Sequence, residues 1–247
     1  MKALLVGLNG HMGEKVVALA KKSYKGLEVV AGVDPISQEG EIPCFADFSS
    51  IDAKVDCIID FSHHSLTIPM LEYAVNNGIP TIIATTGQTE EEKAAISNAA
   101  SSIPLFYAAN YSIGVALLCE LAKKTAAVMD DTEIEIIETH HDRKIDAPSG
   151  TALAIADAIR EARPELSNNC GRSGNCKRTE GEIGINSIRI GNVVGIHEVL
   201  IGTNNQTITL KHEAHDRALF AEGAVTAAEF LLGKEPGLYS MTDMVKF

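Results

Sequence analysis

The sequence predicts an α/β protein: a doubly wound parallel sheet, followed by a second α+β domain built on a separate mixed or antiparallel sheet. Three observations support this prediction. Short apolar strand patterns alternate with helical patterns through residues 1–112, a glycine-rich turn follows the first strand pattern, and longer alternating strand patterns begin after Ile113. Regular alternation of strands and helices indicates parallel pairing, because each parallel strand needs a crossover to reach the next.

The first predicted domain, residues 1–112, contains five strand patterns separated by helical ones. The opening stretch, KALLVGLNGHMGEKVVALAKKS, predicts a buried strand, a tight turn and an amphipathic helix. Four further strands are predicted from short apolar runs, namely LEVVAGVD, VDCIIDFS, IPTIIATTG and IPLFYAANYS. Helical spacing of apolar residues predicts the helices LTIPMLEYAVNNG and TEEEKAAISNAASS.

The second predicted domain, residues 113–216, starts with a long helical pattern and continues with longer strands. The stretch EIEIIETHH alternates in polarity as a half-buried strand does, and a helix is expected to begin near Ser149. A polar loop, PELSNNCGRSGNCKRTEGEIG, precedes the last strand patterns, GINSIRIGNVVGIHEVLIG and QTITLKHEAH. The tail, residues 217–247, is again helical at RALFAEGAVTAAEFLLG, and we expect it to return to the first domain.

The composition is that of a globular chain: 45% of the 247 residues are hydrophobic, and the formal net charge is -12. The sequence has no apolar run long enough for a membrane span, no basic run typical of nucleic-acid binding and no signal-peptide pattern, so we expect a cytoplasmic protein. Neither a disulfide framework nor a metal site is predicted, because the cysteines are scattered without a CxxC pair: Cys44, Cys57, Cys119, Cys170 and Cys176.

The glycine-rich turn, Gly7-Leu8-Asn9-Gly10-His11-Met12-Gly13, has the spacing GxxGxxG, with Asn9 where dinucleotide-binding loops usually have a second glycine. Asparagine tolerates positive φ better than most residues, so a tight turn can still form. Such a turn presents backbone N–H groups and the positive end of a helix to a pyrophosphate. Because it lies between a strand and a helix, we interpret it as a dinucleotide-binding loop rather than a simple surface turn.

Asp34 ends the second strand, about 20 residues beyond the turn, where a carboxylate can accept hydrogen bonds from the ribose hydroxyls of NAD. The loop that follows, DPISQEGEIP, contains no Arg or Lys to pair with a 2′-phosphate. We therefore predict that NADH is the preferred cofactor and that NADPH is a weaker alternative. The competing interpretation is that Asp34 is only a turn residue before Pro35.

Four cationic or titratable side chains crowd the end of the EIEIIETHH strand: His140, His141, Arg143 and Lys144. Successive strand residues point to opposite faces, so we expect the two histidines to have different roles. Such crowding in a chain with a net charge of -12 favours an anion site over ordinary surface histidines.

The stretch Pro148-Ser149-Gly150-Thr151 has the features of a helix start, with Ser149 or Thr151 as the cap. The same geometry can bind a carboxylate, because it offers hydroxyl groups, free N–H groups and a glycine that permits close approach. With the dinucleotide loop, this predicts hydride transfer to a small carboxylate-bearing substrate beside an acid catalyst. The residues alone do not name that substrate.

The chain resembles the dihydrodipicolinate reductase family (4-hydroxy-tetrahydrodipicolinate reductases) of the diaminopimelate and lysine pathway, over essentially its whole length. The most specific element runs from Glu138 to Ala152 and is similar to the family signature E-x-H-H-x-x-K-x-D-A-P-S-G-T-A. Supporting motifs are the glycine turn, DFS at 60–62, TTG at 85–87, AANYSIGV at 108–115, IGINSIRIGNVVGIHEV, and FAEGAV at 220–225.

The resemblance implies a Rossmann-type domain completed by the C-terminal tail, a substrate domain with a mixed four-stranded sheet, hinges near Ile113 and Arg217, and a homotetramer assembled through the sheets. It implies His140 as the general acid and Lys144 as its cationic partner. It also implies that a dicarboxylate substrate is bound by His141, Ser149, Gly150 and Thr151. The implied cofactor-binding residues are Gly7, Leu8, Asn9, Gly10, His11, Met12, Asp34, Ala84, Thr85, Thr86, Ala108, Ala109, Asn110 and Tyr111.

The chain departs from the family pattern at several positions. The family's glycine loop usually carries arginine at the position of His11, and NADPH-using members have arginine at the position of Pro35. Both changes remove partners for a 2′-phosphate. Asp142 adds a carboxylate to the cationic cluster, while Ala84 and Tyr111 replace a usual glycine and phenylalanine on the nicotinamide side.

Three alternatives stay open from the sequence. The chain could be a dinucleotide-sensing regulator without chemistry, but the presence of both the acid residue and the carboxylate-binding residues argues against this. It could also be a related imino-acid dehydrogenase. The basic loop at Asn168–Arg178 is expected to be a solvated hairpin, and the alternative is a cationic flap over the substrate.

Overall fold

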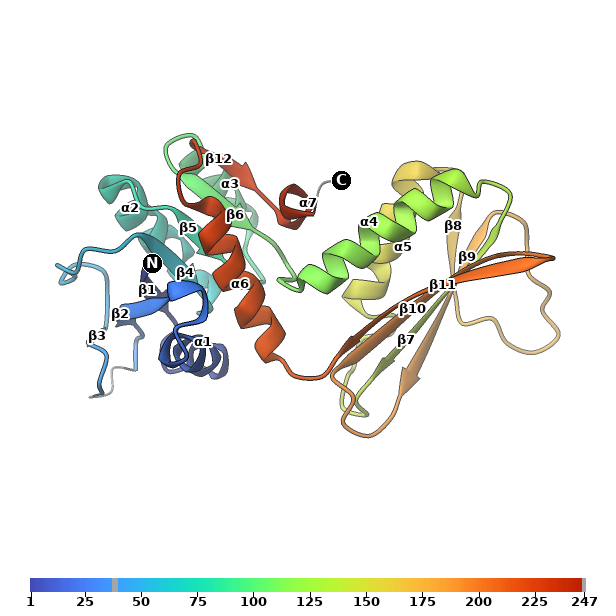
Figure 1. Cartoon of the computed structure of the whole chain (residues 1–247), viewed down its shortest axis with the longest axis horizontal. Helices are drawn as coiled ribbons and strands as arrows, with labels where there is room; N and C mark the ends of the chain where they lie inside the picture. Colours follow the sequence, from blue (N-terminus) through green and yellow to red (C-terminus); the bar gives the residue numbers. More distant parts are fainter. Residues whose placement is uncertain (37–39, 246–247) are drawn as a thin grey trace. The chain divides into compact units, whose positions relative to one another are not determined.

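The structure of the protein is a computed structural model that describes residues 1–36 and 40–245 (Figure 1). The chain forms two compact units. The first comprises Met1–Tyr111 together with Ala218–Phe247, and the second comprises Ser112–Arg217. The chain therefore leaves the first unit after Tyr111 and returns to it at Ala218, and each unit has a hydrophobic core of its own.

Within the described residues, the first unit is built on a seven-stranded sheet in the order β12-β6-β5-β4-β1-β2-β3, with every neighbouring pair parallel. The five predicted strands are present as β1 (Lys2–Val6), β2 (Glu28–Val33), β4 (Cys57–Asp60), β5 (Thr81–Ile83) and β6 (Pro104–Tyr107). The sequence does not predict the edge strands β3 (Cys44–Phe45) and β12 (Gly237–Tyr239). Two or three residues are too few to show an alternating pattern.

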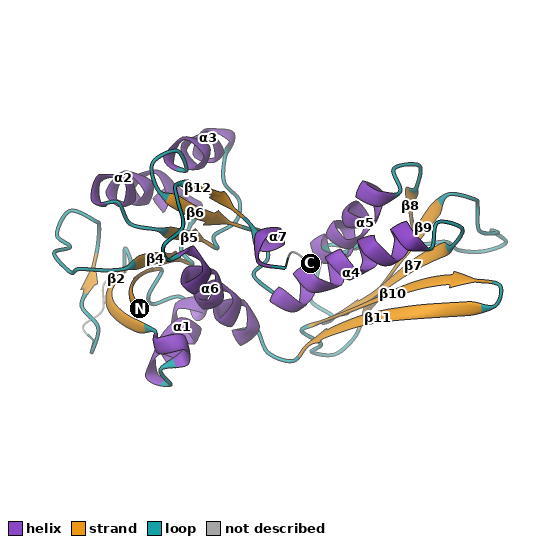
Figure 2. Ribbon diagram, turned by 45° about the horizontal axis from the view of Figure 1, so that its top comes forward, coloured by secondary structure: helices purple, strands orange, loops and turns teal. Residues whose placement is uncertain are grey.

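Helices cover both faces of this sheet (Figure 2). On one face, α2 (Thr67–Asn77) and α3 (Glu90–Ala99) pack over a core that includes Leu4 and Ile58. On the other face, α1 (His11–Lys21) and α6 (Ala218–Leu231) contact each other. The remaining helical elements are short, namely the 3-10 turns η1 (Tyr24–Gly26) and η2 (His64–Leu66) and the helix α7 (Met241–Met244).

Local signals in the sequence explain where these helices begin and end. Thr89 and Glu92 form a capping box at the start of α3: Thr89 Oγ1 accepts from the Glu92 N–H at 3.2 Å, and Glu92 Oε2 accepts from the Thr89 N–H at 2.7 Å. Gly78 ends α2 with a φ of 65°, a left-handed conformation that favours glycine. Across the described ranges, none of the helices has the length and apolar character needed to cross a membrane.

The second unit is a mixed sheet in the order β11-β10-β7-β9-β8, counted over the described residues. Its strands are β7 (Glu133–His140), β8 (Ser167–Cys170), β9 (Glu182–Arg189), β10 (Gly195–Thr203) and β11 (Gln206–Ala214). The expected mixed sheet is present, but it has five strands rather than four. The extra strand, β8, has the sequence Ser-Asn-Asn-Cys, and its lack of apolar alternation explains why the sequence predicts a loop there.

Two helices, α4 (Ile113–Val128) and α5 (Gly150–Ala162), cover one face of the second sheet (Figure 2). Their apolar residues pack on the inward positions of β7, which include Ile134 and Ile136. Because side chains alternate along a strand, Glu138 and His140 lie on this same inward face. Two polar residues therefore end a core-facing row, and α5 begins beside them at Gly150.

Candidate active site

The glycine-rich turn connects β1 to the start of α1. Gly7 has a φ of 84°, and a Cβ there would lie 2.6 Å from the carbonyl oxygen of Phe61, so only glycine fits. A Cβ at Gly13 would collide with the carbonyl oxygens of Gly7 and Leu8. Gly10 immediately precedes α1 and has no side chain to cap it, which leaves the first N–H groups of the helix available to an anion. This cradle fits the pyrophosphate of a dinucleotide.

Asp34 lies just beyond β2 and is held against the glycine turn. Its Oδ2 accepts from the Asn9 N–H at 3.1 Å, and its Oδ1 accepts from the Ile36 N–H at 3.0 Å. The Asn9 side-chain amide donates to the Ile36 carbonyl at 2.7 Å. Asn9 thus ties the turn to the Asp34 loop and fixes the carboxylate, while residues 37–39 of that loop lie outside the described residues.

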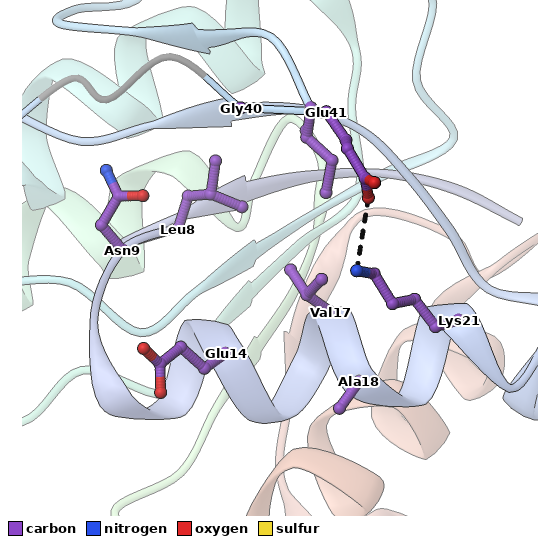
Figure 3. Close-up of a pocket in the computed structure, with 9 residues that line it drawn as sticks. Leu8, Asn9, Glu14, Val17, Ala18, Lys21, Gly40 and Glu41 are labelled. Carbon is purple, nitrogen blue, oxygen red and sulfur yellow. Dashed lines mark ion pairs between the residues drawn. The ribbon is translucent and has the colours of Figure 1, made fainter.

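A hollow of about 470 Å³ lies beside the glycine turn, between α1 and the segment 40–42 (Figure 3). Its charged lining consists of Glu14, Glu41 and Lys21, and the Lys21 ammonium pairs with Glu41 at 3.3 Å. The lining described here therefore has an excess of negative charge, which does not favour an additional phosphate.

Some of the predicted nicotinamide-side residues, together with Met12 of the glycine turn, line a second, smaller cavity of about 240 Å³. Its lining includes five of the predicted residues and two that the sequence interpretation missed, Phe61 and Phe220; the predicted ones are Met12, Ala84, Ala109, Asn110 and Tyr111. The Tyr111 hydroxyl is buried and donates to the Ile83 carbonyl at 2.8 Å, so it supports the cavity wall rather than offering a free donor. Elsewhere, Thr85 is buried, Ala108 is partly buried, and Thr86 and His11 are exposed.

Glu138 organises the cationic cluster of the second unit, a role that the sequence interpretation missed. Its carboxylate is fully buried and accepts from His140 Nδ1 at 2.6 Å, from the Ser149 N–H at 3.1 Å, and from both terminal nitrogens of Arg189 at 2.9 and 2.7 Å. Burial disfavours the charged form, but hydrogen bonds from Arg189, Ser187 and His140 outweigh burial and lower the pKa of Glu138 to about 2. One anion therefore fixes a histidine ring and a helix start together.

His140 ends β7 with only 8% of its surface exposed. Because ionised Glu138 must accept at Nδ1, the ring presents Nε2 as its exchangeable position. A Cβ at Gly195 would lie 3.1 Å from this Nε2, so the glycine at the start of β10 leaves room in front of it. His140 is thereby oriented for proton transfer at a defined nitrogen.

His197, on β10, is a third histidine in the cluster. Its ring packs edge-on against His140, with centroids 5.2 Å apart, and its Nε2 lies 3.1 Å from the Ser149 hydroxyl. Burial foremost, and then the charge of His140, lower the pKa of His197 to about 4, so it is neutral near pH 7. A histidine in phase with the buried residues Val199 and Ile201 is the signal that could have found it.

His141 and Lys144 follow His140 in the turn after β7. The backbone N–H of His141 donates to the Val193 carbonyl at 2.8 Å, and burial, followed by the charge of Arg143, lowers the pKa of its ring. Lys144 Nζ donates to both carboxylate oxygens of Asp146, at 2.8 and 2.9 Å. Asp146, which the sequence interpretation did not select, thus anchors the predicted cationic partner.

Of the two caps that the sequence allows, Ser149 and Thr151, the structure uses Ser149, whose Oγ accepts from the Ala152 N–H at 3.2 Å at the start of α5. Gly150 begins the helix, and among the described residues nothing lies within 4 Å of the position that its Cβ would occupy. Thr151 follows in a half-buried position. Packing does not demand a glycine at residue 150, so the open space there suits the close approach of a ligand.

The remaining charges of the predicted cluster are already paired. Arg143 donates to Asp142 at 3.0 Å and to Asn192 at 2.6 Å. Both pairs are exposed, and Asp142 offsets the charge of Arg143 at the surface.

The basic loop after β8 is held on the helix-free side of the sheet. Arg172 donates to Glu135 at 2.8 Å, and Arg178 donates to Glu135 and to the Glu182 carbonyl. Because both guanidinium groups are bonded to acceptors of the sheet, this arrangement supports a surface loop held against the sheet and gives no support to the alternative of a cationic flap.

A parallel sheet with a glycine turn of the dinucleotide-binding type, joined in one chain to a second unit with a histidine cluster beside a helix start, is typical of an NAD(P)H-dependent oxidoreductase. Sequence comparison then assigns the family. The profile described as "Dihydrodipicolinate reductase, N-terminus" matches residues 1–111, and the profile described as "Dihydrodipicolinate reductase, C-terminus" matches residues 114–245. The chain belongs to the dihydrodipicolinate reductase family.

Individual relatives agree with this assignment. The 4-hydroxy-tetrahydrodipicolinate reductase of Caldanaerobacter subterraneus subsp. tengcongensis is 42% identical over 250 residues, covering 100% of this chain and 98% of the relative. The enzyme of that name from Alkaliphilus oremlandii is 42% identical over 248 residues, covering 99% and 98%. A dipicolinate-bound dihydrodipicolinate reductase from a Paenisporosarcina species matches the structure with a TM-score of 0.85 at 25% identity, covering 99% of each chain.

Proposed function

We propose that the protein reduces 4-hydroxy-tetrahydrodipicolinate, or the dihydrodipicolinate formed from it by loss of water, to tetrahydrodipicolinate in lysine and diaminopimelate biosynthesis. The observation that carries this proposal is the buried Glu138 carboxylate, which orients His140 and the Ser149 helix start at once, with Lys144 in the adjoining turn. Family membership and the names of the relatives support the choice of substrate.

The proposed chemistry assigns a separate task to each side chain. When bound, NADH would supply the hydride that adds to C4 of the substrate. Negative charge then develops toward the ring nitrogen and its carboxylate, and the Lys144 ammonium stabilises it as it forms. His140 donates a proton from Nε2 to the neighbouring ring carbon, C3, which restores the C=N bond of the product, and a positioned acid of this kind contributes about 10² to 10⁴ in rate.

Substrate binding is assigned to the start of α5 and to His141. Ser149, Gly150 and Thr151 offer backbone N–H groups and hydroxyls to one carboxylate, where the helix dipole favours negative charge. Burial, and then neighbouring cations, lower the pKa of the His141 ring and so favour its neutral form, and we assign to this ring a hydrogen bond to the substrate. This arrangement fixes the orientation of a planar dicarboxylate.

For the cofactor, we propose that NADH is preferred and that NADPH is tolerated less well. The Asp34 carboxylate, fixed by the N–H groups of Asn9 and Ile36, suits ribose hydroxyls and would repel a 2′-phosphate. The negatively charged hollow beside the turn acts in the same direction (Figure 3). A comparison of kcat/KM with the two cofactors tests this preference, and a tenfold advantage for NADPH would contradict it.

We also propose a homotetramer assembled through the helix-free face of the second sheet. That face includes Ile137 on β7 and Ile196 and Leu200 on β10, which are half-buried and point away from α4 and α5. Light scattering should give a mass of about 105 kDa, four times the 26.3 kDa of one chain. A mass near that of a single chain would refute the assembly.

The decisive assay couples the protein to dihydrodipicolinate synthase and follows NADH absorbance. The proposal predicts NADH oxidation that depends on the synthase. His140→Ala and Lys144→Ala should each lower kcat about a hundredfold or more while leaving NADH affinity almost unchanged. NADH binding without any oxidation would favour a dinucleotide sensor, and turnover of another imino or keto acid would favour a related dehydrogenase.

A further inference from the structure

His197 occupies a position that the proposed mechanism does not use. It is 3% exposed and lies on the helix-facing side of β10, paired in register with Glu138 of β7 and with His212 of β11. The groups that face it are the His140 ring, the Glu138 carboxylate, His212, the Lys144 ammonium and the Ser149 hydroxyl. Because the His197 ring is buried among these groups, the position of its hydrogen determines which hydrogen bonds the ring can make.

The two ring nitrogens of His197 have different surroundings. Nε2 lies 3.1 Å from Ser149 Oγ, whereas Nδ1 is buried and has no hydrogen-bond partner among the described residues. The ring is neutral near pH 7, so only one of the two nitrogens carries hydrogen. A buried N–H without an acceptor is rarer in proteins than an acceptor without a donor. The hydrogen therefore belongs on Nε2, where it donates to Ser149.

This placement decides what Ser149 can do. Its Oγ already accepts from the Ala152 N–H as the cap of α5, and it also accepts from His197 Nε2. A hydroxyl oxygen has two acceptor positions and one hydrogen. With both acceptor positions filled, the oxygen cannot accept from a ligand, and its own hydrogen remains to be donated.

We propose that His197 is a positioning residue that, by donating from Nε2, makes the Ser149 hydroxyl a dedicated donor to a substrate carboxylate. This inference rests on the proposed function, because it assumes that Ser149 meets a carboxylate. The His197 ring also packs edge-on against the His140 ring, so it helps to hold the proposed acid, His140, in place. A neutral His197 in addition spares the cluster a further positive charge next to Lys144.

The position of the hydrogen can be measured without any substrate. Two-bond ¹H–¹⁵N correlation spectra of histidine-labelled protein near pH 7 distinguish the two neutral forms of each ring. We expect the His197 signals, assigned by their loss in His197→Gln, to show hydrogen on Nε2. Hydrogen on Nδ1 would overturn the inference, whatever the enzyme reduces.

The consequence for binding is tested with dipicolinate as the probe. His197→Phe keeps an aromatic ring but removes the donor, whereas His197→Gln keeps an N–H that can reach Ser149. We expect the dipicolinate Kd to rise about tenfold or more in His197→Phe, the scale of one hydrogen bond to a charged group, and to recover largely in His197→Gln. Circular dichroism of each variant separates loss of binding from loss of the fold, and equal loss in both folded variants would indicate a merely structural ring.

A double-mutant cycle tests whether His197 affects dipicolinate binding through the Ser149 hydroxyl. If His197 acts through the hydroxyl, His197→Phe should add little to the Kd change of Ser149→Ala, because the donor is already gone. Fully additive effects would overturn the proposal. Failure of the proposed function would look different: the unmodified protein would neither bind dipicolinate nor oxidise NADH, while the ¹⁵N spectrum would still report the state of His197.

Discussion

Replacing Glu138 by Gln changes one buried charge and almost no volume. In the native site the carboxylate accepts four N–H groups, from His140, Ser149 and Arg189. The amide of glutamine retains one acceptor oxygen and turns an N–H₂ toward donors. Arg189 loses its counter-ion although its side chain is only 19% exposed, and the His140 Nδ1–H loses a charged acceptor.

The lowered pKa of Glu138 gives the expected loss of stability in Glu138→Gln. A fall in the pKa of Glu138 from 4.5 to about 2 corresponds to about 3 kcal/mol of stability. We take about half of this, because water reaches part of Arg189 and screens its charge. Removing one partner of a buried pair also leaves the other desolvated, so we expect Glu138→Gln to lose about 2 to 3 kcal/mol. Since the acid is no longer held, kcat should fall about a hundredfold.

Urea unfolding followed by circular dichroism measures the first effect, and the coupled NADH assay measures the second. With a slope of about 2 to 3 kcal/mol per molar, the midpoint should fall by about 1 M. Glu90→Gln is the matched control: it removes the same charge from an exposed pair with Lys93, 2.7 Å apart, and should change stability by less than about 1 kcal/mol.

The lowered pKa of Glu138 also predicts how the stability of the protein depends on pH. Because its pKa is lowered on folding, its stabilisation is complete above about pH 4.5 and disappears as the pH falls toward 2. Glu138→Gln should therefore lose less stability than the native protein across that window. A variant with native stability, native kcat and an unchanged acid profile would refute the role assigned to Glu138.

Three further substitutions give separate tests. Gly150→Ala meets no neighbour among the described residues, so stability should be unchanged or rise by up to about 1 kcal/mol, while KM for the dicarboxylate increases; an unchanged KM argues against binding there. Gly195→Ala places a methyl group 3.1 Å from His140 Nε2 and should lower kcat about tenfold in the coupled assay. Full activity would show that the space in front of this nitrogen is not needed for catalysis. Asp142→Asn breaks only the exposed pair with Arg143, so thermal unfolding and kcat should both stay near native values, and a large fall in kcat would place Asp142 in the chemistry.

Much of the fold follows from local patterns. Apolar runs with glycine or polar ends predict the five inner strands of the first unit, and the pattern TEEEKAAISNAASS predicts the helix that the structure contains as α3. The edge strands and β8 escape prediction because they are two to four residues long and owe their conformation to the neighbouring strand. Their pairing is a tertiary contact that no short window of sequence records.

Part of the candidate site can likewise be predicted from the sequence. His140, Lys144 and Ser149 are close in sequence, so their clustering is visible in one stretch. Glu138 lies in that stretch as well, at a position in phase with Ile134 and Ile136, and a charged residue in a core-facing row signals a buried partner.

The sequence by itself determined the order of the elements, the dinucleotide turn and the cationic stretch, because these depend on spacing along the chain. Only the tertiary structure decided which partners complete the site. Arg189 reaches Glu138 because β9 pairs with β7 in parallel, and His197 reaches Ser149 because β10 pairs with β7 antiparallel. Strand register is fixed by packing of whole faces against α4 and α5, and a shift of one residue would turn each of these side chains to the opposite face.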